Sequence, residues 1–237
     1  MWQERTKLLL KKDKLQALNQ AHILIVGLGG VGSFAAEFLA RSGVGQLTLV
    51  DGDQIDQSNI NRQLPALHST INQDKTAIVA RRLRDINPDI KLNIISEFML
   101  PEAFEDLVSS ADFDYIIDAI DSVSPKVYLI LAAKRFKTKI VSAMGAGGKM
   151  DPSQVKVADI SKTRDDYLAR VIRKRLRKKG VQKGVKCVFS TELQAAEALQ
   201  MTTDSDFKKS HYGTISYMPA LFGLYAAATV IRYLTRD

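Results

Sequence analysis

The most constraining feature of this chain is a GxGxxG pattern that directly follows an apolar run. The run covers residues 22–26, and the glycines are Gly27, Gly29 and Gly32. Asp51 ends the next apolar run along the chain. Glycines at these positions let a backbone turn tightly and approach a phosphate, while a carboxylate at the end of the second strand can bind ribose hydroxyls. The pattern predicts a nucleotide-binding β-α-β unit.

A polar loop after Asp51 favours a triphosphate over a dinucleotide. The loop contains Asn59, Asn61 and Arg62, and Lys75 follows it. A dinucleotide has a bridging pyrophosphate and needs little added positive charge. Arg62 and Lys75 beside a glycine turn suit a ligand on which several negative charges must be neutralised together. An NAD-linked oxidoreductase is the alternative, and only the glycine pattern supports it.

The predicted elements alternate between strands and helices. Strands are expected at 22–26, 46–50, 91–96, 113–118 and 139–143. Helices are expected at 4–20, 30–42, 74–86, 102–110 and 125–136. This alternation predicts a Rossmann-like α/β fold, with a mostly parallel sheet and helices on both faces.

The pattern changes after the glycine-rich stretch 145–148. Strand-like segments at 154–160 and 185–189 flank a basic helix at about 165–179, and a polar loop to His211 leads to an apolar helix at 219–234. We find neither an internal repeat nor a low-complexity linker. We therefore expect a single domain over residues 1–237, with a core at about 20–145 and a C-terminal elaboration at about 146–237.

The positive charge of the chain is concentrated in one segment. The net charge is +8, yet residues 162–186 alone hold eleven Lys and Arg against two Asp. Such a concentration indicates a polyanion partner. The longest apolar run, 218–231, is too short to span a bilayer, and the charged N-terminus lacks the apolar core of a signal peptide. With a single cysteine the chain has no internal disulfide, so we expect a cytoplasmic protein without membrane contact.

Several ordered motifs together resemble a known superfamily. They are VGLGGVGS at 26–33, LTLVDGD at 47–53, SNINRQ at 58–63 and DAIDS at 118–122. These motifs are similar to those of the adenylating enzymes related to ubiquitin-activating enzymes. Later blocks of the sequence resemble one branch of this superfamily, the tRNA threonylcarbamoyladenosine dehydratases. These blocks are DAIDSVSPK, GAGGKMDPSQVKVADISKT, CVFSTE and GTISYMPALFG.

The resemblance implies an ATP-dependent reaction on tRNA. The carboxylate of the threonylcarbamoyl group would be adenylated, and a neighbouring atom of the same side chain would then close a ring with net loss of water. The alternative within the superfamily is adenylation of the C-terminal glycine of a ubiquitin-like or sulfur-carrier protein. The paired CxxC motifs of the sulfur-carrier activators are absent, which disfavours that activity and leads us to expect no zinc. The motifs leave open whether a sulfur-transfer protein binds. A non-catalytic tRNA-binding module would predict a degraded nucleotide site, which these motifs do not show.

The residue types and the resemblance together define the expected ATP site. It comprises Gly27, Gly29, Gly30, Gly32, Asp51, Ser58, Asn59, Asn61, Arg62, Lys75, Asp121 and Ser122. Arg62, Lys75 and Asp121 are the expected catalytic residues, and by resemblance Asp121 binds Mg²⁺. Asp118 is expected to cap the loop or to hold a second-sphere water. The resemblance also implies a homodimer in which Arg5 reaches the triphosphate of the partner, although an exposed helix arginine is an equally good interpretation. A homodimer is also expected because the apolar helix 219–234 and the N-terminal helix offer more hydrophobic surface than one small sheet needs to cover.

The basic helix is the expected tRNA contact. Leu168, Ile172 and Leu176 recur every four residues and form a narrow apolar stripe for docking onto the protein. The expected tRNA-binding residues are Arg170, Arg173, Lys174, Arg177 and Lys178. A solvated surface helix is the plain alternative, but the local charge is larger than docking requires.

The cysteine and the histidines carry weaker signals. Many relatives transfer the activated acyl group to a cysteine, yet Cys187 lies in VKCVF, an apolar strand-like segment, so we favour a structural role. His22, His68 and His211 lack the spacing of metal ligands, and we expect them to serve in packing or in loops.

Overall fold

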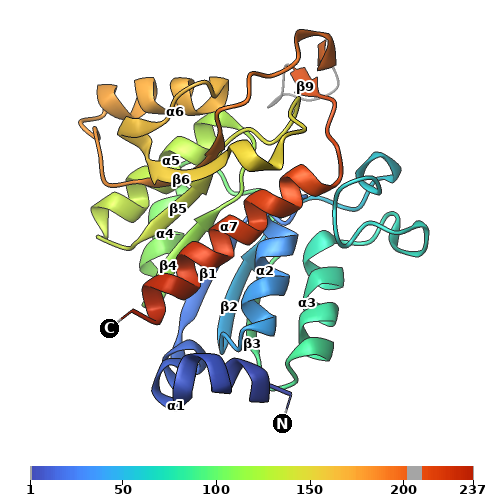
Figure 1. Ribbon diagram of the computed structural model, residues 1–237, viewed down its shortest axis with the longest axis vertical. Coiled ribbons are helices and arrows are strands. Elements are labelled where there is room, and N and C mark those ends of the chain that lie inside the picture. Colours follow the sequence, from blue (N-terminus) through green and yellow to red (C-terminus); the bar gives the residue numbers. More distant parts are fainter. Residues whose placement is uncertain (1, 202–209, 237) are drawn as a thin grey trace.

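The computed structural model describes residues 2–201 and 210–236 (Figure 1). Its centre is a sheet of seven strands in the order β3-β2-β1-β4-β5-β7-β6. The strands are β1 His22–Val26, β2 Gln46–Val50, β3 Lys91–Ile95, β4 Tyr115–Asp118, β5 Ile140–Ala143, β6 Val155–Asp159 and β7 Lys186–Ser190. All neighbouring pairs are parallel except β6 with β7. The predicted Rossmann-like α/β fold with a mostly parallel sheet is confirmed.

Helices cover both faces of the sheet (Figure 1). They are α1 Glu4–Gln20, α2 Gly32–Arg41, α3 Lys75–Ile86, α4 Ala103–Ser109, α5 Val123–Arg135, α6 Tyr167–Lys178 and α7 Tyr217–Leu234. Alternate strand residues point to opposite faces, so Ile23 and Ile25 join a core with α2, α3 and α7, while Leu24 and Val26 join a second core with α4, α5 and α6. This double burial explains why the central strands are apolar throughout.

The predicted boundaries differ from the structure mainly at helix starts. We predicted a helix from residue 30, but α2 begins at Gly32 because the glycine turn occupies the preceding residues. The expected helix 4–20 has a break at Lys11, where φ is 64°. The predicted strand 113–118 begins only at Tyr115.

The C-terminal part extends the sheet. Strands β6 and β7 add to its edge next to β5, and α7 then returns across the molecule to pack on α2 (Figure 1). The expected polar loop before α7 contains a short antiparallel pair, β8 Leu199–Met201 and β9 Ser210–Tyr212, which sequence did not predict. None of the helices in the described part of the chain combines the length and apolar character that a membrane crossing requires.

The apolar helix α7 is covered within the chain itself. Its residues Met218, Phe222, Ala226 and Val230 are fully buried against the sheet and α2. A Cβ atom at Gly223 would lie 2.4 Å from the carbonyl oxygen of Val31, so the glycine permits a close helix contact. We had expected α7 to offer surplus apolar surface to a second subunit. That expectation is wrong for most of the helix, because α2 and the sheet already use its apolar side.

Candidate active site

The glycine turn is held between two neighbouring strands. Gly27 has φ of +90° and its N–H donates to the Val50 carbonyl oxygen over 2.8 Å. A Cβ atom at Gly32 would lie 1.7 Å from the carbonyl oxygen of Gly27. Both positions therefore require glycine, and the turn brings main-chain groups to the carboxyl edge of the sheet, where ligands bind in open parallel sheets.

Asp51 is attached to this turn. Its carboxylate accepts hydrogen bonds from the backbone N–H of Leu28 over 2.6 Å and of Asp53 over 2.8 Å. Burial raises the pKa of Asp51, and the positive charge of Lys75 opposes that rise. The carboxylate thus lies at the end of β2 beside the turn, the position from which a ribose is bound in this type of fold.

Arg62 lies near Asp121. Its Nη1 donates to the carbonyl oxygen of Ser58 over 2.7 Å and to Asn61 Oδ1 over 2.8 Å. Burial lowers the pKa of the Arg62 guanidinium, and the nearby carboxylate of Asp121 raises it. A Cβ atom at Gly30 would lie 3.0 Å from the carbonyl oxygen of Arg62. The arginine loop therefore lies against the glycine turn, with Asp121 near Arg62.

The two asparagines of this loop have separate tasks. Asn59 is buried and its Oδ1 accepts from the N–H of Asp56 over 3.3 Å, which stabilises the turn that holds Ser58. Asn61 Nδ2 donates to the carbonyl oxygen of Thr214 over 2.9 Å. Thr214 lies just before α7, so Asn61 joins the nucleotide loop to the C-terminal elaboration. Ser58 is exposed.

Lys75 is paired with an aspartate. It is the first residue of α3, it is 4% exposed, and its Nζ lies 2.6 Å from Asp53 Oδ2. A cation at the start of a helix opposes the helix dipole and is stabilised by a nearby anion. In the structure Asp53, whose side chain is 48% exposed, provides that anion. Lys75 also lies near Asp51, whose pKa its charge lowers.

A fully buried ion pair fixes the loop that carries Asp121. Asp118 Oδ1 accepts from the N–H of Ile120 over 3.0 Å, while Asp118 Oδ2 accepts from Ser142 Oγ over 2.5 Å and lies 2.8 Å from Lys126 Nζ. Asp118 and Lys126 are both 0% exposed. The predicted capping role of Asp118 agrees with this geometry. Sequence reasoning missed Lys126, although a lysine in an apolar helix start eight residues after Asp118 was a usable signal.

Asp121 is the exposed carboxylate of this loop. Ser122 Oγ donates to its Oδ1 over 3.3 Å. Within residues 2–201 and 210–236, no three His, Cys, Asp or Glu side chains lie close enough to hold a metal ion. Mg²⁺ keeps several waters and needs only one or two protein carboxylates, so Asp121 suits it when phosphate oxygens provide further ligands. The expectation of no zinc stays a prediction.

Cys187 is buried in β7. It is 0% exposed, and burial raises the pKa of its thiol well above the ordinary range. Its Sγ lies 3.7 Å from the carbonyl oxygen of Val185. A nucleophilic cysteine needs access and a lowered pKa, so the geometry favours the structural role. His22 also has a packing role, since its Nε2 lies 2.8 Å from Thr48 Oγ1.

The basic helix α6 is attached to the sheet by a second buried ion pair. Lys149 Nζ lies 2.9 Å from Asp166 Oδ2, and both side chains are at most 1% exposed. Asp166 also caps α6 by accepting from the N–H of Ala169 over 2.8 Å. The predicted apolar stripe docks the helix, with Ile172 and Leu176 fully buried.

The predicted tRNA-binding residues divide into two groups. Arg173 turns inward, where its Nη1 donates to the Thr163 carbonyl oxygen over 2.8 Å and to Thr163 Oγ1. Arg170 lies over the ring of Tyr167, 5.0 Å from its centroid. Lys174, Arg177 and Lys178 are exposed. Arg173 therefore holds the start of α6 in place, which its sequence position did not reveal.

Arg5 lies at the opposite end of the molecule from the nucleotide edge. It is exposed on α1, whose start contacts the residues before β2: a Cβ atom at Gly43 would lie 2.5 Å from Gln3 Nε2. Figure 1 shows α1 below the amino ends of the strands. Arg5 therefore does not join the ATP site of its own chain.

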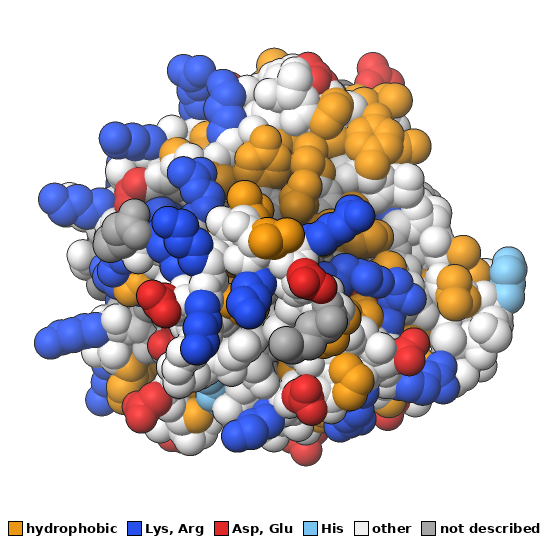
Figure 2. All heavy atoms as spheres, turned by 60° about the horizontal axis from the view of Figure 1, so that its bottom comes forward, with side chains coloured by type: hydrophobic (Ala, Val, Ile, Leu, Met, Phe, Trp, Pro, Cys, Tyr) orange, Lys and Arg blue, Asp and Glu red, His pale blue; other side chains and the backbone are white. Residues whose placement is uncertain are grey.

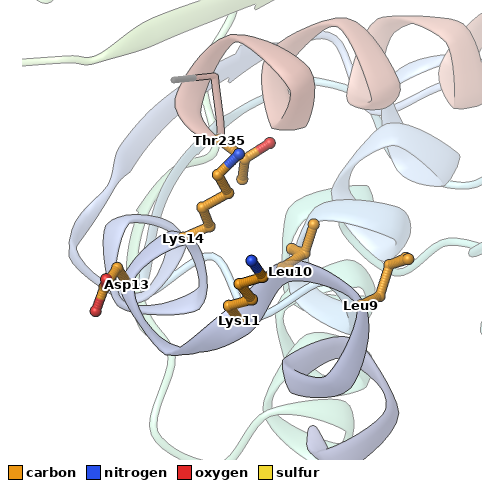
Figure 3. Close-up of a pocket in the computed structure, with 6 residues that line it drawn as sticks. All are labelled: Leu9, Leu10, Lys11, Asp13, Lys14 and Thr235. Atoms are coloured by element: carbon orange, nitrogen blue, oxygen red, sulfur yellow. The ribbon is translucent and has the colours of Figure 1, made fainter.

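The surface around α1 is apolar in part. Leu8 and Leu9 are 79% and 82% exposed. Figure 2 brings this end forward and shows charged side chains mixed with hydrophobic ones over much of the face, with the main hydrophobic area in the upper part of the view. The break at Lys11 borders a cavity of about 420 Å³ beside the end of α7, into which Lys14 extends toward Thr235 (Figure 3).

The fold and this edge together define an ATP-dependent adenylating enzyme. The chain belongs to the ThiF family, whose family model matches residues 3–237. It is 38% identical over 240 residues to the tRNA threonylcarbamoyladenosine dehydratase of Bacillus subtilis, covering 98% of this chain and 94% of the relative. The structure of the Escherichia coli tRNA N6-threonylcarbamoyladenosine dehydratase in complex with ATP superposes with a TM-score of 0.88 at 37% identity, covering 98% of this chain and 94% of that one. The sulfur carrier protein ThiS adenylyltransferase of Escherichia coli is 35% identical over 58% of this chain and 55% of its own length.

Proposed function

We propose that this chain is a tRNA threonylcarbamoyladenosine dehydratase, which uses ATP to cyclise the threonylcarbamoyl group of the modified base. The observation that carries the proposal is the convergence of the glycine turn, Asp51, Arg62 and Asp121 at one sheet edge. A similarity that continues through the basic segment to the end of α7 supports the tRNA substrate.

The residues at this edge fit ATP. Gln63 Oε1 is buried and has no hydrogen-bond partner among the described residues. It belongs to the side chain next to Gly29, where an added Cβ would meet Gln63 Nε2 only at 3.6 Å. A buried acceptor without a donor costs free energy, so a ligand group that donates there is favoured. Asp51 would bind the ribose hydroxyls, and the glycine turn would approach the phosphates.

The reaction has two steps. A carboxylate oxygen of the threonylcarbamoyl group attacks the α-phosphorus of ATP, the bond to the bridging oxygen breaks, and pyrophosphate leaves. A nucleophilic atom of the same side chain then attacks the acyl carbon, the bond to AMP breaks, and a proton is released. One carboxyl oxygen leaves with AMP, which accounts for the net loss of water. The protein positions the groups and neutralises charge at phosphorus.

Arg62, Lys75 and Asp121 would perform this neutralisation. Arg62 donates to the phosphates from a half-buried position, where a charge-assisted hydrogen bond is strong. Lys75 is held near Asp51 by Asp53 and adds positive charge on the ribose side. Asp121 would hold Mg²⁺, which supplies charge neutralisation at the phosphates when bound.

A homodimer would complete the site with Arg5. The exposed Leu8 and Leu9 on α1 provide apolar surface for a second subunit, and Arg5 lies on the same helix. Since Arg5 lies far from its own nucleotide edge, only the Arg5 of a second copy could reach the triphosphate. The exposed apolar side chains of α1 support dimerisation, whereas the apolar side of α7 packs against α2 and the sheet of its own chain.

The tRNA would bind along the basic segment. Lys174, Arg177 and Lys178 are exposed on α6, whose start is fixed to the carboxyl edge by Lys149 and Asp166. Lys and Arg on such a surface bind nucleic-acid phosphates regardless of sequence. Activation of a sulfur-carrier protein is disfavoured, because the similarity to that adenylyltransferase covers only 58% of this chain.

Pyrophosphate exchange into ATP tests the proposal. The wild-type protein should exchange labelled pyrophosphate when Mg²⁺ and threonylcarbamoyl-modified tRNA are both present, and should convert the modified base to a product lighter by one water. The same tRNA without the modification serves as the control and should support no exchange. Exchange with a sulfur-carrier protein and none with modified tRNA would refute the proposal.

A further inference from the structure

The positive charges of the basic segment are not equivalent. Four arginines among its eleven Lys and Arg already have partners within the protein. Their contacts join Arg164 to Asp165, Arg170 to the Tyr167 ring, Arg173 to Thr163, and Arg175 to Ser124 Oγ. The other seven, Arg177 and Lys183 among them, have no such contact among the described residues. Positive charge for a ligand is therefore concentrated on fewer side chains than the sequence suggests.

Arg177 and Lys183 meet at a hollow in the surface. The hollow has a volume of about 410 Å³ and is lined by Ser161, Arg177, Gln182 and Lys183. These residues come from three separate places: the short turn 160–162 after β6, the last turns of α6, and the loop between α6 and β7. Two cations, an amide and a hydroxyl thus surround one space, and none of the acidic side chains in the described part of the chain lines it.

Hydrogen bonds hold the three segments in this arrangement. Asp159 accepts from the N–H and Oγ of Ser161 and, through its other oxygen, from the N–H of Gly184 over 2.6 Å. The N–H of Ile160 donates to the carbonyl oxygen of Val185 over 2.8 Å. Gly180 ends α6 with φ of +82°, which turns the chain back toward Arg177. The hollow is therefore shaped by hydrogen bonds within the protein, and both carboxylate oxygens of Asp159 already accept hydrogen bonds.

We infer that this hollow binds a phosphodiester of the tRNA backbone, away from the reacting base. The inference rests on the proposed function, which makes tRNA the substrate. Arginine, with its planar set of N–H donors, and lysine are the side chains that most often bind phosphate. The hollow is also larger than a single carboxylate group. Arg177 is eleven residues from Asp166, so it lies about 16 Å along α6 from the helix start at the carboxyl edge.

This position gives the hollow a defined task. A group that far from the nucleotide edge does not touch the reacting atoms. It therefore increases the affinity for tRNA and does not change the rate of the chemical step. Loss of the hollow should raise KM for tRNA and leave kcat at saturating tRNA unchanged. The nucleoside threonylcarbamoyladenosine lacks backbone phosphates, so exchange that the free nucleoside supports should not depend on the hollow.

The experiment compares two double variants with the same loss of charge. Arg177→Ala with Lys183→Ala removes the cations of the hollow, and Lys179→Ala with Lys186→Ala removes two exposed cations of the basic segment that do not line it. Dissociation constants for modified tRNA are measured across a salt titration. The hollow variant should bind about tenfold more weakly at low salt, with a log–log salt slope smaller by about 0.7 to 0.9, the change for one lost phosphate contact. The control variant should lose clearly less, and equal thermal midpoints would confirm that both fold.

Each result has one meaning. Equal weakening by both double variants would overturn the inference, because a diffuse field would then bind the tRNA. A loss of nucleoside-supported exchange in the hollow variant would overturn it as well, since the residues would then act on chemistry. Binding of an acidic protein at the hollow with unchanged tRNA affinity would identify a different partner and refute it. If the wild type itself fails to exchange pyrophosphate with modified tRNA, the proposed function fails, and that result is separate from these.

Discussion

The nucleotide edge and the basic segment recognise phosphates by different physical means. At the nucleotide edge, backbone geometry does most of the work: Gly27 and Gly32 permit a turn that a single added methyl group would prevent. In the basic segment, exposed Lys and Arg provide charge on a helix that the sheet supports. The first arrangement is intolerant of small changes in shape. The second tolerates changes in shape and depends on the number and placement of charges.

The two regions also share a device. Each is fixed by one buried lysine–aspartate pair, Lys126 with Asp118 at the nucleotide edge and Lys149 with Asp166 at the start of α6. In both pairs, the most deeply buried charged side chains hold a loop or a helix start in place and do not contact the ligand. The comparison therefore separates residues that position a site from residues that meet its ligand.

Matched glycine substitutions should break the comparison most strongly. Gly32→Ala places a methyl group 1.7 Å from a carbonyl oxygen, so we expect loss of ATP binding and a large drop in the thermal midpoint. Gly180→Ala is the control: its φ is +82°, but no atom lies within 4 Å of the new methyl group. It should cost about 1 kcal/mol and leave ATP affinity intact. Isothermal titration with ATP and thermal denaturation measure both. Normal ATP binding by the Gly32→Ala protein would refute the role of the turn.

Breaking the buried pairs should separate the two regions functionally. Lys126→Met leaves Asp118 as an unpaired buried charge, as Lys149→Met leaves Asp166, and each should lower the free energy of unfolding by about 3–5 kcal/mol. Lys126→Met should also reduce exchange supported by the free nucleoside, whereas Lys149→Met should reduce only the exchange supported by tRNA. Arg135→Ala, at an exposed ion pair, serves as the control and should change neither. Identical activity profiles for the two methionine variants would contradict the separation.

Arg62→Ala tests ligand contact rather than positioning. It removes a charge-assisted contact worth about 1.5–3 kcal/mol, so exchange should fall roughly ten- to a hundredfold while the thermal midpoint without ATP changes little. Arg62→Lys should restore only part of the activity, because lysine lacks the planar fork. Unchanged exchange by the alanine variant would remove Arg62 from the site.

The smallest expected effect concerns His22 and pH. Burial lowers the pKa of His22, and Asp114 partly opposes this shift. The unfolded chain therefore takes up a proton near pH 6.5 that the folded chain does not, so stability should fall as pH decreases through this value. Once the pH is below the folded pKa, the loss should stop. His22→Gln should flatten this part of the profile in urea titrations between pH 5 and 7, and an unchanged slope would show that other groups cause it.

Much of the nucleotide edge could be predicted because its requirements are local. A few neighbouring residues are enough to indicate the role of each motif: the glycine spacing, the carboxylate after a strand, and SNINRQ. The structure places these motifs close together. The pairing of Lys75 with Asp53 escaped prediction, because two residues that flank a long loop show their contact only after folding.

The basic segment was harder to interpret for a related reason. Charge density indicated a polyanion partner, but the direction of each side chain depends on what lies beside α6. Arg173 turns inward and donates to the carbonyl oxygens of residues 160 and 163, which belong to a turn outside the helix. Lys183 joins Arg177 only through the bend at Gly180. Such contacts lie between elements, so helical periodicity does not contain them.

The docking of α7 has a consequence for the order of events during synthesis. Gly223 lies against the carbonyl oxygen of Val31, and the Pro219 side chain lies 2.9 Å from where a Cβ of Gly30 would be. The helix that covers the glycine turn and α2 is therefore translated long after the segments it packs on. While the ribosome synthesises the basic segment, α7 has not yet been made, so α2 and the glycine turn lack the helix that packs against them. A nascent chain should gain ATP affinity only late in translation, so premature binding of nucleotide by an incomplete protein is avoided.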